Sequence, residues 1–288
     1  MNDLLKLHLV ILAWGLTAIL GKLIHLPPVQ MLLWRTSFAA IGFAIVARLV
    51  GQSLPLPGKQ IRTLLLLGGL LGVHWILFFV SARLSTASVS LAAMPTAMLW
   101  CSLIEPWMDG TRRWRPLELV VGVVMVAAVF LIYQVEFRHW QGFSVALAAA
   151  GLAAVFAVMS KQLVSRCHFA VMGTWQMTGA FIACIPSCLW FERGHLVLPS
   201  LADFALLLLL ASLCTVWAYA GYMDVLRRLP MFTVNVIYNL EPIYGIILAI
   251  LVFGAEEHMR FGFYLGSSFI ISSVVILPWL EKWTGQRH

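Results

Sequence analysis

Charged residues are scarce in this chain. Asp, Glu, Lys and Arg make up 11% of its 288 residues, whereas hydrophobic residues make up 61%. A soluble globular domain carries about 25% charged residues, so a soluble fold is excluded. The apolar residues form about ten runs of membrane-spanning length, which leaves almost no sequence for a domain outside the membrane. The composition therefore predicts an all-α polytopic membrane protein.

Sequence signals of catalysis, metal binding and ATP hydrolysis are also lacking. The five cysteines contain no CxxC pair and no metal-ligand spacing, so we interpret them as apolar packing residues. Neither an HExxH motif nor a convincing Ser/His pair indicates a membrane-embedded enzyme, and no Walker A loop indicates an ATP-driven pump. We expect no enzymatic activity, no metal and no cofactor.

The net charge of +7 does not indicate a nucleic-acid-binding protein, because the basic residues are spread singly or in small groups between the apolar runs. Of the 19 Lys and Arg residues, thirteen fall on the side shared by both termini and five on the opposite side, while Arg35 lies inside an apolar run. Cytoplasmic loops carry the excess of Lys and Arg. This distribution places both termini in the cytoplasm and favours an even number of spans.

Ten transmembrane helices are predicted from the apolar runs and the Pro- and Gly-containing connections between them. The predicted spans are residues 4–24, 29–49, 61–81, 86–107, 116–134, 141–162, 169–191, 202–224, 231–253 and 261–281. The first run is too long for the core of a signal peptide and lacks a clear cleavage site, so we interpret it as a span.

The second half of the chain repeats the first through weak matches that keep a common order. The matches are Ala13–Ala18 with Ala149–Ala154, Trp34–Arg35 with Trp175–Gln176, His74–Trp75 with Val216–Trp217, and Pro95 with Pro242. Each half, residues 1–136 and 137–288, has five spans, so the two halves enter the membrane in opposite orientations. Transporters built on such inverted repeats bind their substrate near the midplane, where the halves meet.

A polar stretch, Asn235 to Pro242, interrupts the ninth span. Glu241 lies near the centre of the span, where a carboxylate costs about 2.5 kcal/mol or more. Pro242 removes a backbone donor and releases a carbonyl one turn earlier. Asn235, Tyr238 and Asn239 are three and four residues apart and share one helix face. We interpret this face as part of a substrate-binding or coupling site; the alternative is a hydrogen-bonded cluster that only holds helices together.

Three features of the sequence are also found together in a known family. They are the five-plus-five repeat, the opening Ala13-Trp14-Gly15, and Tyr238-Asn239-Leu240-Glu241-Pro242 followed by Gly254-Ala255-Glu256. In these features the chain resembles the EamA branch of the drug/metabolite transporter superfamily over its full length. The resemblance implies that spans 1–4 and 6–9 line a central cavity. It also implies export or exchange of small metabolites, amino acids foremost, across the bacterial inner membrane.

Two opposite charges are the leading candidates for substrate binding. Arg35 is the only basic residue deep inside a span, and Glu241 of the opposite repeat is its obvious partner. The pair fits an amino acid or other zwitterion, with Arg35 binding the carboxylate as a bidentate fork; a purely structural ion pair is equally open. An unpaired Glu241 would instead become a proton carrier, as in a proton-coupled exporter of lipophilic organic cations. The fixed charge of Arg35 argues against such cargo.

The other candidate cavity residues are polar or aromatic and lie well inside their spans. They are His74, Trp75, Gln176, Trp14 and Trp175. His74 has no second ligand at metal-binding spacing, and its alternative role is packing. The repeat-related Pro95 and Pro242 are predicted hinges for rocking between inward- and outward-open states. The expected partners are a small-molecule substrate, the lipid bilayer and protons, in a monomer or homodimer.

Overall fold

The structure is a computed structural model. It describes residues 2–108, 137–191, 193, 195–229 and 240–254, together with positions 124, 127, 234, 237–238, 261–262, 264–266, 268–269, 272 and 276. All regular secondary structure in these residues is helical, as predicted. Seven helical stretches in the described part are long and apolar enough to cross a membrane.

The first half begins with three long helices, α1 (Asp3–Leu23), α2 (Pro28–Leu49) and α3 (Gly58–Leu84). Side chains and prolines set where helices start: the Asn2 carboxamide accepts a hydrogen bond from the Leu4 amide at 3.0 Å, and Pro28 opens α2. The fourth span is divided into α4 (Ala87–Ala93), the 3-10 turn η1 (Met94–Thr96) and α5 (Ala97–Met108).

The second half is also helical in its described residues. Its helices are η2 (Phe137–His139), α7 (Trp140–Leu163), α8 (Phe169–Phe191), α9 (Leu201–Ala211), the π-helical segment η3 (Ser212–Trp217), α10 (Ala218–Arg228) and α12 (Glu241–Phe253). Ser200 caps α9 by accepting a hydrogen bond from the Asp203 amide at 3.1 Å. Segments α9, η3 and α10 form one continuous stretch, which corresponds to the predicted eighth span.

The predicted boundaries of spans 1–4 and 6–8 agree with the structure to within a few residues. Most of the fifth and tenth predicted spans lies outside the described residues, although every described position in them is helical. The ninth span was predicted as one helix over 231–253, and that is wrong. Leu240 is in a turn and α12 starts only at Glu241, because Pro242 has no N–H to continue the ladder from the preceding turn.

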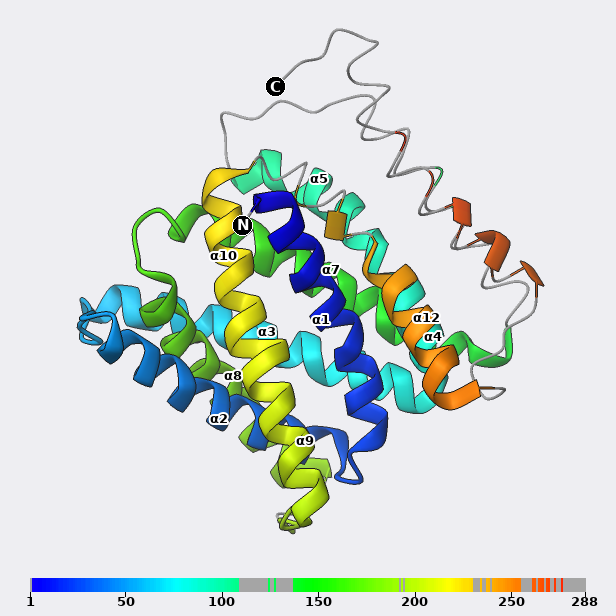
Figure 1. The fold of residues 1–288 in the computed structure, drawn as a ribbon, viewed down its shortest axis with the longest axis horizontal. Helices are drawn as coiled ribbons and strands as arrows, with labels where there is room; N and C mark the ends of the chain where they lie inside the picture. Colours follow the sequence, from blue (N-terminus) through cyan, green and yellow to red (C-terminus); the bar gives the residue numbers. More distant parts are fainter. Residues whose placement is uncertain are drawn as a thin grey trace, which may run out of the picture.

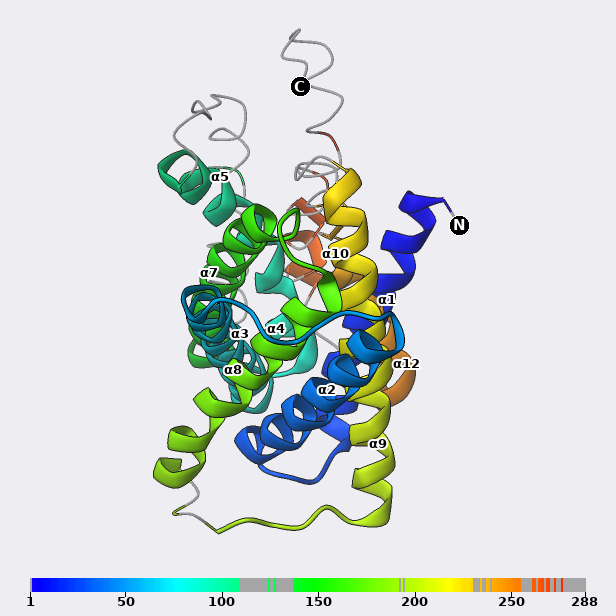
Figure 2. The same cartoon turned by 90° about the vertical axis from the view of Figure 1, so that its left-hand side faces the viewer.

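The helices form two layers, with α1, α10 and α12 in front of α3, α7 and α8 (Figures 1 and 2). Glycines allow the backbones to touch. A Cβ on Gly68 of α3 would lie 1.9 Å from the Gln176 carbonyl oxygen of α8, and one on Gly179 would lie 2.1 Å from the Leu65 carbonyl oxygen. The halves also meet where a Cβ on Gly15 of α1 would lie 3.0 Å from the Gly245 nitrogen of α12. Small residues at such crossings are typical of membrane bundles.

A group of four charged residues marks the face on which α1 begins and α10 ends, here called the N-terminal face. Arg228 contacts Asp3 at 2.8 Å and Asp224 at 2.6 Å, and Lys6 also pairs with Asp224. These four residues are called the charge cluster below. Since it joins the start of α1 to the end of α10, the two stretches run antiparallel (Figure 1).

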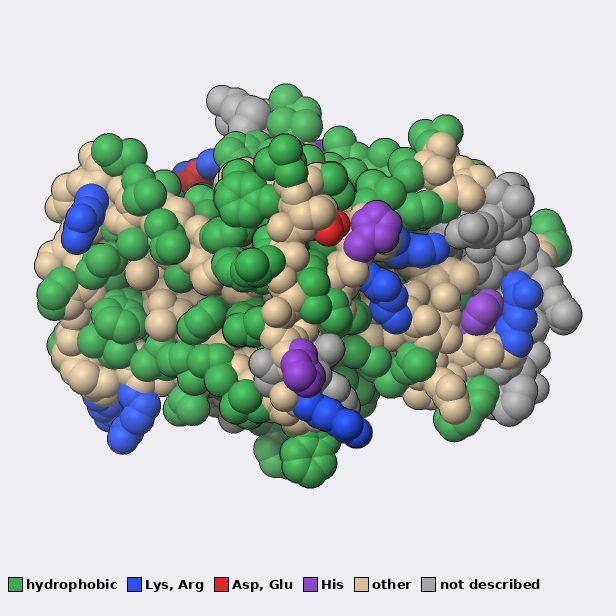
Figure 3. Space-filling model, turned by 90° about the horizontal axis from the view of Figure 1, so that it is seen from below, with side chains coloured by type: hydrophobic (Ala, Val, Ile, Leu, Met, Phe, Trp, Pro, Cys, Tyr) green, Lys and Arg blue, Asp and Glu red, His purple; other side chains and the backbone are tan. Residues whose placement is uncertain are grey.

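On the opposite face, side chains bond to backbone groups of neighbouring segments. Buried Gln30 donates to the His195 carbonyl and accepts from the Val197 amide, both at 2.7 Å. Asp203 accepts from the His25 amide at 2.9 Å. Seen from this side, basic and histidine side chains are scattered over a surface that is mainly apolar (Figure 3).

Candidate functional site

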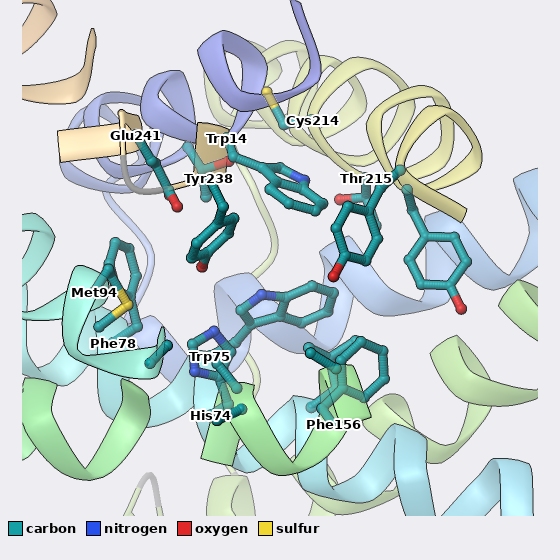
Figure 4. Close-up of a pocket in the computed structure, with 18 of the residues that line it drawn as sticks. Trp14, His74, Trp75, Phe78, Met94, Phe156, Cys214, Thr215, Tyr238 and Glu241 are labelled. Atoms are coloured by element: carbon teal, nitrogen blue, oxygen red, sulfur yellow. The ribbon is translucent and has the colours of Figure 1, made fainter. Parts of the chain in front are cut away.

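A cavity lies between the two layers of helices. Its wall is strongly aromatic, and both halves of the chain contribute (Figure 4). The aromatic lining residues are Trp14, Trp75, Phe78, Phe156, Tyr219, Tyr222 and Tyr238. Besides the tyrosine hydroxyls, the wall carries the hydroxyl, imidazole or charged groups of Thr17, Arg35, His74, Thr215 and Glu241. A mainly apolar, aromatic wall with a few polar groups is typical of small-molecule sites.

Glu241 enters the cavity from the point where the ninth span is interrupted. The Leu240 amide donates to the Ile237 carbonyl at 3.0 Å, which closes a tight turn just before α12. The Glu241 side chain is 6% exposed, accepts a hydrogen bond from Tyr238, and has no partner for Oε2 among the described residues. The first turn of a helix stabilises a carboxylate through its free N–H groups. The break therefore positions a buried acid that keeps one oxygen available.

Arg35 reaches the cavity from α2 and is 1% exposed. Its Nε donates to Thr215 Oγ1 at 2.9 Å, and the guanidinium carbon lies 4.2 Å from the centre of the Trp75 ring. Nη1 is buried and has no hydrogen-bond partner in the described part of the chain. The predicted partner Glu241 does not pair with Arg35, so the structural ion pair is a wrong expectation for this conformation. Figure 4 places Glu241 and Trp75 on different sides of the cavity.

His74 presents one ring nitrogen to the cavity and uses the other for structure. Nδ1 lies 2.8 Å from the carbonyl oxygen of Ala149. A carbonyl can only accept, so Nδ1 carries the proton and Nε2 of the neutral ring is an acceptor. The two roles considered for His74, packing and cavity lining, are therefore combined in one side chain.

The π-helical segment η3 supplies Thr215, which the sequence did not single out. Its hydroxyl lies 2.9 Å from the carbonyl oxygen of Leu210, five residues earlier, instead of the four that an α-helix would give. Such widened turns occur frequently at functional sites. Here the widened turn places Thr215 against Arg35 and leaves neighbouring Cys214 on the cavity wall.

The second half of the chain, residues 140–278, matches the model of the EamA-like transporter family. This stretch is just under half of the chain, and it is an EamA-like transporter domain. The match supports membership of the drug/metabolite transporter superfamily, and with it a multi-pass membrane transporter, as the sequence resemblance implied. The crystal structure of another protein matches this EamA-like transporter with a TM-score of 0.72 and 16% identity, and the match covers 97% of both chains. That likeness concerns the fold alone. The search of curated proteins gave no match.

Six of the ten predicted binding residues of this EamA-like transporter line the cavity. They are Trp14, Arg35, His74, Trp75, Tyr238 and Glu241. Their roles in binding stay predictions. Trp14 packs on two tyrosines, with ring centres 5.0 Å from Tyr222 and 5.9 Å from Tyr238. Asn235 and Asn239 lie outside the described residues.

Two predicted residues of α8 do not line the cavity. Trp175 points toward the connection after α2, where its Nε1 donates to the Leu54 carbonyl at 3.0 Å. Gln176 is fully buried one layer behind the wall, where it accepts a hydrogen bond from the Tyr219 hydroxyl. It supports a lining residue instead of facing the cavity itself.

The predicted hinges lie at the two interrupted spans. Pro95 is buried in η1, between the cavity-lining residues Met94 and Ala97. The backbone at Pro242 belongs to the first turn of α12, and its side chain is not described. Hinge motion at either position stays a prediction.

Helical spacing was the signal that could have found several lining residues missed in the sequence. Thr17 lies three residues after Trp14, and Phe78 lies four residues after His74, so each pair shares a helix face. Phe156 and Met94 had no such signal, because apolar residues are found on every side of their helices.

Proposed function

We propose that this transporter exports or exchanges small zwitterionic metabolites, amino acids foremost, across the bacterial inner membrane by alternating access. One observation carries the proposal. A single cavity contains a buried guanidinium and a buried carboxylate that are not paired with each other, and each keeps a polar atom without a partner in the described residues. A zwitterion would supply both missing partners in one molecule.

Energetics supports this interpretation of the two charges. An uncompensated buried ion costs several kcal/mol, so such groups are retained where function needs them. Arg35 offers a planar cation that matches a carboxylate, and Glu241 offers an acceptor for an ammonium group. The aromatic wall adds apolar surface for a side chain and ring faces for the ammonium group.

We propose further that ten helices form two inverted five-helix repeats, with both termini in the cytoplasm. Packing in the described part is consistent with this symmetry. In the first half α1 packs against α10 and α12, and in the second half α7 packs against α3, α4 and α5. These are corresponding partners if α7 repeats α1. The interruptions at η1 and just before α12 also fall in corresponding spans, as expected where discontinuous helices form a midplane site.

A proton-coupled exporter of lipophilic organic cations is the second candidate. The observation that favours it is Oε2 of Glu241, which is buried without a partner and could carry a proton. Arg35 lines the same cavity and would repel a cation. We therefore rank this function below zwitterion transport.

A thermal-shift screen of the purified protein tests both candidates. The panel contains the twenty common amino acids, nucleosides, sugars and organic cations. A ligand at about one hundred times its Kd stabilises the folded protein by about 2.7 kcal/mol, which is measurable. We expect amino acids to stabilise the protein, and Glu241→Gln or Arg35→Ala to remove the effect. Stabilisation by organic cations alone would overturn the first proposal in favour of the second.

A further inference from the structure

Arg35 donates a hydrogen bond from Nε, whereas its Nη1 is buried without a partner in the described residues. Nε is the only guanidinium nitrogen that donates a hydrogen bond to the described residues, and its acceptor is Thr215 Oγ1 at 2.9 Å. One flat face lies over Trp75 at 4.2 Å, with Phe79 further away at 6.0 Å. A planar fork offers a carboxylate two docking edges, Nε with one Nη or the two Nη atoms together. Thr215 occupies the first edge.

The direction of the Thr215 hydrogen bonds is fixed by its neighbours. The hydroxyl has a single proton, and the Leu210 carbonyl at 2.9 Å can only accept, so the proton points toward Leu210. The oxygen is then free to accept from Nε of Arg35, which can only donate. The π turn of η3 is what brings residues 210 and 215 together. Both bonds are satisfied at once, and the guanidinium is held in one orientation between Thr215 and Trp75.

We propose that Thr215 is the residue that positions Arg35, so that the Nη1–Nη2 edge binds the substrate carboxylate end-on. This inference rests on the proposed function and deepens it, because it names a free carboxylate as the group that the transporter requires. Two carboxylate oxygens match the two parallel N–H groups of that edge. A carboxamide offers one acceptor and turns an NH₂ group toward the cation, and an amine without the carboxylate leaves the edge empty.

The experiment measures binding to the full-length protein in detergent by isothermal titration calorimetry. The probes are L-phenylalanine, L-phenylalaninamide and phenethylamine, which share one aromatic side chain and differ in the carboxylate. The wild type should bind the acid at least about tenfold more tightly than the amide or the amine, a difference of 1.4 kcal/mol. Thr215→Val should reduce this ratio severalfold, and Thr215→Ser, which keeps the hydroxyl, should restore it.

Thr174→Val is the matched control. Thr174 is also a buried helical threonine, but its hydroxyl donates to the Ala170 carbonyl of its own helix at 2.8 Å, and it is not among the residues that line the cavity. Its substitution should leave the acid-to-amide ratio unchanged. Where Thr215→Val does not yield folded protein, Thr215→Ala removes the same hydroxyl and takes its place.

A second measurement shows which nitrogens of the Arg35 guanidinium bind the carboxylate. The ¹⁵Nε–H resonance of Arg35, assigned by its loss in Arg35→Lys, should move little when L-phenylalanine binds, while the Nη signals move strongly. A large shift of Nε, or an acid-to-amide ratio that survives Thr215→Val and Thr215→Ala, would overturn the inference while the proposed function stands. Absence of binding by all twenty amino acids would overturn the proposed function and this inference with it.

Discussion

Two sets of charged side chains in this protein differ in whether each charge has a partner. The charge cluster on the N-terminal face pairs every one of its members, and Asp224 alone bonds to both Lys6 and Arg228. In the cavity, Arg35 and Glu241 are almost completely buried, and each keeps an atom without a partner in the described residues. Pairing is complete where water could have solvated the charges and incomplete where it could not.

This difference separates charges that hold the fold from charges that serve the substrate. Paired surface charges contribute little free energy, about 0.2–1 kcal/mol for each pair, because water screens them. Unpaired buried charges destabilise the folded state by several kcal/mol. Selection for stability alone would remove the second kind, so their presence fits a site that gains its partners on binding.

The largest effect is expected from Glu241→Gln. The substitution keeps the shape of the side chain but removes both its charge and its ability to release a proton. We expect transport into proteoliposomes to be abolished or uncoupled from the pH gradient, while size-exclusion chromatography shows folded protein. Unchanged transport with unchanged pH dependence would remove Glu241 from the site.

Arg35→Ala is expected to have the next largest effect. Loss of a charge-assisted hydrogen bond costs about 1.5–3 kcal/mol, so binding of carboxylate-bearing ligands should weaken roughly tenfold to a hundredfold. Neutral ligands of similar size should lose much less. Calorimetric titration of both ligand classes decides the matter, and equal losses would make Arg35 a structural residue.

Arg35→Met should leave the protein at least as stable as the wild type, although binding is lost. The substitution removes a cation–π contact worth about 2 kcal/mol, but it also removes a desolvation penalty of several kcal/mol. Thermal unfolding should therefore occur at the same or a higher temperature, by roughly 2–4 °C for each kcal/mol gained. A large drop in unfolding temperature would mean that Arg35 is already well compensated in the empty cavity.

The smallest effect is expected in the charge cluster, from Asp224→Asn. Lys6 and Arg228 would lose a partner that lies near the surface, so the free energy of unfolding should fall by about 1 kcal/mol or less. High salt should shrink the difference further, because it screens exposed charges. Ligand affinity should not change. Chemical denaturation at low and high salt, with a binding measurement beside it, checks all three expectations.

The sequence predicted which residues lie in helices better than it predicted where their side chains point. Apolar runs and prolines located the helices because length and hydropathy decide insertion. Trp175 and Gln176 lie in α8, the predicted seventh span, yet neither faces the cavity. Lipid and neighbouring helices are both apolar, so a spanning helix lacks the polar face that would reveal its rotation.

The π-helical segment around Thr215 could not be predicted from the sequence either. It depends on where the Leu210 carbonyl and the Arg35 guanidinium lie in the folded protein, and no local residue pattern encodes either. The break before α12 was signalled by Pro242, but its consequence was underestimated. A proline removes one donor and often leaves a helix only kinked, whereas here Leu240 is in a turn and α12 begins at Glu241.

If the two halves rock against each other, the close contact between Gly15 of α1 and Gly245 of α12 would act as a fulcrum between these two helices. It lies beside the site, since a Cβ on Gly15 would also lie 3.5 Å from the Glu241 carbonyl oxygen. Gly15 is twelve residues from the start of α1, or about 18 Å at 1.5 Å per residue. A tilt of about 15° at this contact would displace that end of the helix by about 5 Å and leave the fulcrum nearly still. The bound molecule would then keep the same contacts while the opening of the cavity changes from one side of the membrane to the other.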